Sequence, residues 1–196
     1  MSQGPLTEDD IARARAAVAA RDPPTSVIEM CALNDKVRPV LLADSVTAGE
    51  FFYRLSVFVR SVSPDERIQI CGVIADAGTL ALIIEVLNVF VKDSVVLCSA
   101  ASFLDLFFQG GHKYVEEFVS QGGLTALYAA ARAHSMNSRL LVAVVRTLCT
   151  IAESCPSVLP EMRRGVTAGL SAIFLDRARM LGTTTYAYRL IALLKE

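Results

Sequence analysis

Residues 118–134 read FVSQGGLTALYAAARAH and place two glycines, Gly122 and Gly123, between two apolar stretches. The apolar residues on both sides recur at helical spacing and lack the alternation of a half-buried strand. A double glycine between two helices predicts a sharp turn, because glycine adopts unusual backbone angles and its missing side chain lets helices approach closely. The same helical spacing recurs along most of the chain, so we predict an all-α fold.

The composition is that of a folded chain with no strong charge. Of the 196 residues, 53% are apolar and 20% are charged, and the formal net charge is -1. Near-neutrality argues against a general nucleic-acid-binding protein, which would carry a basic stripe. The longest apolar run, residues 79–91, contains Glu85 and Asn88 and is shorter than the roughly 20 residues that a membrane span needs. We therefore expect no membrane span.

The cysteines and the N-terminus both predict a reducing compartment. No secretion signal is recognisable in the first residues. The five cysteines are odd in number and form no C-x-x-C pair, which favours reduced thiols in the core; they are Cys31, Cys71, Cys98, Cys149 and Cys155. We expect an intracellular, cytoplasmic protein.

Helix boundaries are visible at several places. Ser63, Pro64 and Glu66 have the spacing of an N-cap, a first helical residue and a capping-box acid. Asp93 predicts the start of another helix, which should end at Gly110 and Gly111 in a left-handed turn. Farther upstream, Pro39 predicts a break between helices.

The sequence also repeats. Residues 74–117 align with residues 118–161 at a shift of about 44 residues, and a further shift of about 43 reaches the C-terminal helix. In this alignment, Leu80 aligns with Leu124, and Leu104 aligns with Leu148. A period of this length is typical of helical-repeat proteins. We therefore expect stacked helical units.

Two stretches resemble the armadillo family. VSQGGLTALYAA resembles the glycine-containing junction between the first and second helices of its repeat, and VVRTLCTIA resembles the end of the third helix. The resemblance covers about residues 63–196 and implies a right-handed superhelical solenoid of three-helix repeats. Its structural turns would be Gly78, Gly122, Gly123 and Gly165. Residues 63–196 would form about three repeats in one continuous domain, preceded by a degenerate repeat over 25–62 and by a capping helix or partly flexible arm over 1–24.

In this family the third helices line a groove that binds other proteins. The resemblance places the family's Trp-like position at Ser102, Arg146 and Arg189, and its Asn position at Leu106, Thr150 and Leu193. The chain departs from the family at all six positions, which argues against a receptor for basic import signals. Arg146 and Arg189 are either a row that binds an acidic or phosphorylated segment or a solvated face, with Arg146 paired to Glu153 or simply hydrated.

No catalytic motif accompanies these patterns. His112 and His134 lack further metal ligands at suitable spacing, so we expect no bound metal. Because no catalytic or phosphate-binding motif is recognisable, we also expect no cofactor and no enzymatic activity. The leading hypothesis is a scaffold or adaptor that binds a partner protein through the third-helix groove or an apolar end. The alternatives are a permanent subunit of a larger, for example cytoskeletal, assembly and a nucleic-acid- or phosphate-binding repeat protein that uses the Arg row. The apolar helix at residues 186–196 suggests contact with a second copy or a complex.

Overall fold

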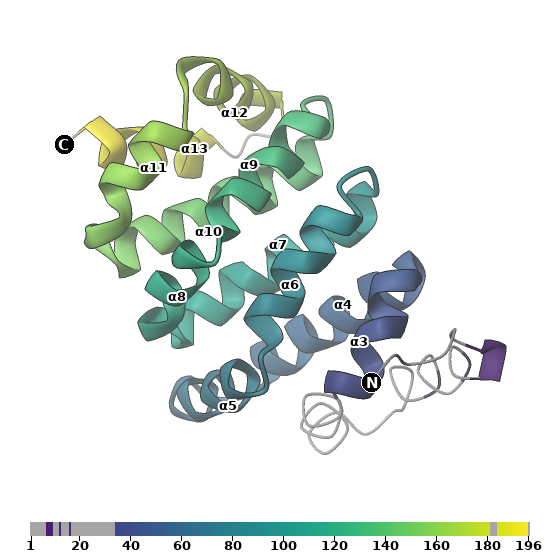
Figure 1. Cartoon of the computed structure of the whole chain (residues 1–196). Helices are drawn as coiled ribbons and strands as arrows, with labels where there is room; N and C mark the ends of the chain where they lie inside the picture. The colour runs from purple at the N-terminus through teal and green to yellow at the C-terminus, as the bar shows by residue number, and fades with distance from the viewer. Residues whose placement is uncertain (1–6, 10–11, 13–15, 17–33, 181–183, 196) are drawn as a thin grey trace.

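The computed structural model describes residues 7–9, 12, 16, 34–180 and 184–195, and every regular element within them is helical (Figure 1). This confirms the predicted all-α fold for the described residues. Apart from residues 7–9, 12 and 16, the capping helix or arm predicted for residues 1–24 lies outside the described residues, as do residues 25–33 of the predicted degenerate repeat.

The described chain begins with two helices, α3 (Asn34–Ala43) and α4 (Ser45–Ser61). Pro39 lies inside α3, so the predicted break at this residue is wrong. The two helices are instead separated at Asp44, whose extended backbone starts α4 and whose carboxylate accepts a hydrogen bond from the Thr47 amide at 3.1 Å.

The helices that follow are arranged as three successive units of three helices each. The first unit comprises α5 (Pro64–Asp76), α6 (Thr79–Val89) and α7 (Ser94–Gly110). The second comprises a 3-10 turn (His112–Tyr114), α8 (Val115–Ser120), α9 (Gly123–Ala133) and α10 (Ser138–Ser154). The third comprises a 3-10 turn (Pro156–Val158), α11 (Leu159–Gly165), α12 (Ala168–Met180) and α13 (Thr184–Lys195).

Side-chain caps set where several of these helices begin. Ser63 and Glu66 form the predicted capping box at the start of α5. Asp93 accepts hydrogen bonds from the Val95 and Val96 amides at the start of α7, and Asn137 does the same for Leu140 at the start of α10. These bonds satisfy amides that would otherwise lack partners in the first helical turn.

The four predicted turn glycines are needed for two different reasons. Gly78 and Gly122 have φ values of 74° and 87°, in the left-handed region that glycine tolerates best. Gly123 and Gly165 are needed for space, because a Cβ atom would lie 2.3 Å from the Phe118 ring at Gly123 and 2.0 Å from the Tyr128 ring at Gly165. The double glycine thus combines one backbone requirement with one packing requirement.

Helix α7 ends at Gly110, as predicted, but Gly111 has a φ of -104° and is not left-handed. A Cβ atom on Gly111 would instead come within 3.0 Å of the Phe107 carbonyl oxygen and ring. Close packing therefore favours glycine at this end of the helix.

Helices α4, α7, α10 and α13 pack successively against one another, and we call them the helix row (Figure 1). Helices α3, α6 and α9 pack in the same sequence beside the row. Phe103, Phe107 and Phe108 of α7 are fully buried, with Phe103 stacked at 6.1 Å from Phe52 and Phe108 at 5.2 Å from Phe118. The apolar end of α7 is thus core, covered by the chain itself.

None of the described helices is by itself both long enough and apolar enough to cross a membrane, although three sharply bent helix pairs meet those criteria by length and composition.

Candidate functional site

The helix row carries the side chains that the repeat pattern placed in a groove. Its surface has two parts with different chemistry. The open groove is formed by α4, the N-terminal half of α7 and the start of α10. The ion-pair chain comprises Asp105, Arg146, Thr150, Glu153, Tyr186 and Arg189 and connects α7, α10 and α13.

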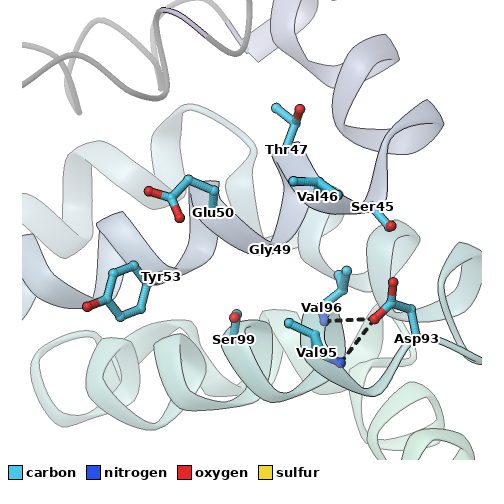
Figure 2. Close-up of a pocket in the computed structure, with 10 residues that line it drawn as sticks. All are labelled: Ser45, Val46, Thr47, Gly49, Glu50, Tyr53, Asp93, Val95, Val96 and Ser99. Carbon is cyan, nitrogen blue, oxygen red and sulfur yellow. Dashed lines mark hydrogen bonds between the residues drawn. The ribbon is translucent and has the colours of Figure 1, made fainter.

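The first cavity of the open groove has a volume of about 750 Å³ and lies between α4 and α7. Figure 2 shows Val46, Glu50 and Tyr53 on α4, with Val95 and Ser99 on the neighbouring α7. The cap at Asp93 fixes the start of α7 at the edge of this cavity.

A second cavity of about 470 Å³ continues the first. The two cavities share Tyr53, Val95 and Ser99, so they form one groove. The second cavity is also lined by Ser102, Cys98 and two arginines, Arg60 and Arg139. The groove therefore becomes more polar toward the C-terminal end of α4.

Large apolar side chains are exposed along this groove. The exposed fractions are 72% for Val46, 71% for Val95, 58% for Tyr53 and 49% for Val57. Side chains of this kind gathered on one surface typically mark a place where another molecule docks. The buried face of α4, with Phe51, Phe52 and Leu55, meanwhile packs into the core. Helix α4 is thus apolar on two faces, and only one of them is covered by the described chain.

The charges of the groove are distributed unevenly. In the first cavity, Glu50 forms a salt bridge with Arg54 at 2.6 Å. In the second cavity, Arg60 and Arg139 are both exposed, and neither guanidinium has a hydrogen-bond or salt-bridge partner within the described part of the chain. The described lining of the second cavity contains these two cations and no carboxylate, so this lining is positively charged.

The ion-pair chain begins at Asp105, a buried carboxylate on α7. Arg146 of α10 pairs with it at 2.9 Å, and the Thr150 hydroxyl donates a hydrogen bond to its other oxygen at 2.7 Å. The Arg146 guanidinium also lies over the Tyr186 ring of α13, 5.3 Å from the centroid, in a favourable cation–π geometry. Arg146 therefore joins three successive helices of the row.

Arg189 of α13 forms a salt bridge with Glu153 of α10. The pairing considered from the sequence, Arg146 with Glu153, is wrong, because Arg146 binds Asp105 and Glu153 binds the next arginine. Arg146 is partly exposed and Arg189 is exposed, but each is already paired with a carboxylate of the chain.

The six predicted groove residues thus have different environments. Ser102 lines the second cavity of the open groove. Leu106 is buried in the core, Leu193 packs partly against it, and Thr150 is bonded to Asp105. Arg146 and Arg189 belong to the ion-pair chain.

The sequence reasoning missed the apolar and basic residues of the open groove. These residues are Val46, Tyr53, Val57, Arg60, Val95 and Arg139. A signal was present in α4, because Val46, Tyr53 and Val57 recur at helical spacing and form a second apolar stripe beside Phe51, Leu55 and Phe58.

The described cysteines, Cys71, Cys98, Cys149 and Cys155, are free thiols. Burial raises the pKa of Cys71 to about 11 and that of Cys149 to about 12, which makes thiolate formation unfavourable at neutral pH. Burial also raises the pKa of Cys98 in the open groove, while Arg139 and a hydrogen bond from Ser102 act in the opposite direction. His134, one of the two histidines, has its Nε2 2.9 Å from the Val91 carbonyl, a contact between two loops. Within the described ranges, no three His, Cys, Asp or Glu side chains are grouped so that they could hold a metal ion.

Comparison with known proteins gave no match: no family model, no curated protein and no solved structure is similar to this chain.

Proposed function

We propose that this protein is a non-enzymatic scaffold or adaptor of the cytoplasm, built as an armadillo-like right-handed solenoid, and that it binds a partner protein through the open groove. The observation that carries the proposal is the continuous groove over α4 and α7, with four large apolar side chains exposed to solvent. The recurring helix order and the successive packing of the row support the repeat architecture.

The groove supports protein binding better than the other functions considered. A nucleic-acid or phosphate role would rely on Arg146 and Arg189, and both already carry carboxylate partners. A partner that buries apolar surface suits the exposed valines, because burial of apolar area is the main favourable term in protein association. Permanent incorporation into a larger assembly would use the same surface and would differ mainly in lifetime.

The proposal is tested by affinity purification with matched variants. The variant V46E/V95E places two charges in the open groove, at positions already exposed, so folding should change little. The control I68E/V73E places the same charges at exposed apolar positions of α5, outside the groove. We expect the proteins that crosslink to the wild type and co-purify with it to be absent from purifications of V46E/V95E and present in those of I68E/V73E. Equal retention by both variants, or no partner of the wild type, would contradict the proposal.

A further inference from the structure

The open groove has a chemical polarity along its length. Its first cavity exposes Val46, Tyr53 and Val95 and carries two carboxylates, Glu50, which pairs with Arg54, and Asp93, which caps α7. Its second cavity carries Arg60 from α4 and Arg139 from α10, each without a carboxylate partner among the described residues. An occupant that complements this surface has apolar side chains at one end and negative charge at the other.

From this polarity we propose that the open groove binds an acidic peptide segment of a partner protein, in which apolar residues occupy the cavity between Val46 and Val95 and an Asp or Glu carboxylate lies between Arg60 and Arg139. This inference rests on the proposed function and adds the chemistry and the direction of the bound segment.

Several features favour a peptide carboxylate. A guanidinium matches the planar geometry of a carboxylate and forms two parallel hydrogen bonds with it. The cavity around the arginines also contains the hydroxyl groups of Ser94 and Ser99, which can donate to carboxylate or peptide oxygens. The ring of Tyr53 lies at the junction of the two cavities and offers a flat apolar surface there.

The length of the groove suits a short segment. Lining residues extend along α4 from Ser45 to Arg60, which corresponds to roughly 20 Å at the rise of an α-helix. About six residues of an extended peptide cover that length. A partner segment of this size can contact both cavities at once.

The test begins with selection from a random 12-residue peptide display library on the immobilised full chain. We expect the selected peptides to be enriched in Asp or Glu next to apolar or aromatic residues. Binding of one selected peptide, measured by fluorescence polarisation, should weaken at least about tenfold in R60E/R139E, because attractive contacts become repulsive. It should also weaken as salt is raised.

The matched control is R164E/K195E, which makes the same change in charge at exposed positions outside both cavities. Its affinity should stay within about twofold of the wild type, since screening weakens charges distant from the site. Thermal unfolding of both double variants checks that each is folded.

Three results would overturn the inference. Peptides that lose binding in V46E/V95E but lack acidic residues and bind R60E/R139E normally would refute the acidic segment while leaving the proposed function intact. The absence of any selected peptide sensitive to V46E/V95E would refute the proposed function as well. A dimer of the wild type in sedimentation experiments, dissociated by V46E/V95E, would show that a second copy occupies the groove.

Discussion

The open groove and the ion-pair chain lie on the same row of helices, but their arginines have different surroundings. Arg146 and Arg189 are bound to Asp105 and Glu153, so they connect neighbouring helices of this chain. Arg60 and Arg139 have no such partners within the described residues and line the second, more polar cavity of the open groove. An arginine of the helix row is therefore available to a partner only where no carboxylate of the described residues already binds it.

The largest contrast between the two regions should appear in thiol labelling. Cys149, beside the ion-pair chain, is buried, and burial raises its pKa to about 12, so its thiol is protonated and unreactive at pH 8. Cys98 lines the open groove and is partly exposed. In a maleimide time course followed by peptide mapping, we expect Cys98 to react while Cys149 stays unmodified. Equal labelling rates in the native protein would contradict the difference in burial between the two regions, and denatured protein serves as the control in which both cysteines react.

The next largest effect is expected for R146E. It places a second carboxylate beside the buried Asp105 and removes the cation that neutralises it. Loss of one partner of a buried pair costs 3–5 kcal/mol, and the partial exposure of Arg146 reduces this to about 2 to 3 kcal/mol. Urea unfolding measures the change.

The matched variant R139E, in the open groove, should change the free energy of unfolding by no more than about 0.5 kcal/mol. If R139E and R146E were equally destabilising, the two arginines would have the same structural role, contrary to this account.

Two adjacent valines at the start of α7 have opposite environments, one in the open groove and one in the core. Val96 is 1% exposed and Val95 is 71% exposed. V96A should cost about 2 kcal/mol, since it removes buried methyl groups and leaves a cavity. V95A should be neutral or slightly stabilising, because alanine is a better helix former than valine. Differential scanning calorimetry of the two variants tells them apart; a large loss of stability in V95A would mean that the groove is closed by the chain itself.

The smallest effect is expected for R189A. Both side chains of the Arg189–Glu153 pair are exposed or partly exposed, and such pairs contribute about 0.2 to 1 kcal/mol. The loss should be about 0.5 kcal/mol and should shrink at high salt. A double-mutant cycle with E153A isolates the coupling, and a value above about 2 kcal/mol would place this pair with the buried Asp105 pair.

The sequence predicted the elements better than the site. Spacing and local signals were sufficient for the helices, the capping box at Ser63 and the glycine turns, because these depend on residues close together in the chain. The partner of Arg146, Asp105, could not be predicted from the sequence. Asp105 lies in the preceding unit, and an aspartate inside an apolar stretch gives no local indication of the residue that pairs with it.

The open groove was missed for a related reason. The second apolar stripe of α4 is visible in the sequence, but whether another helix covers it depends on packing between distant segments. The family positions that the resemblance implies lie in the middle and C-terminal parts of α7, α10 and α13, whereas the groove lies over the N-terminal half of α7. The residues at these family positions lie on helices of the row, but most of them lie outside the open groove.

The most direct test of the central claim is methyl NMR of the protein, labelled at valine and leucine, during titration with an acidic peptide selected from the display library. The account predicts that the methyl resonances of Val46, Val57 and Val95 shift as the peptide binds, because these side chains line the open groove. The resonances of Leu190 and Leu193 on α13 should remain unchanged. Shifts at Leu190 and Leu193 without shifts at Val46 and Val95 would place the binding surface at the C-terminal end of the row and contradict the account.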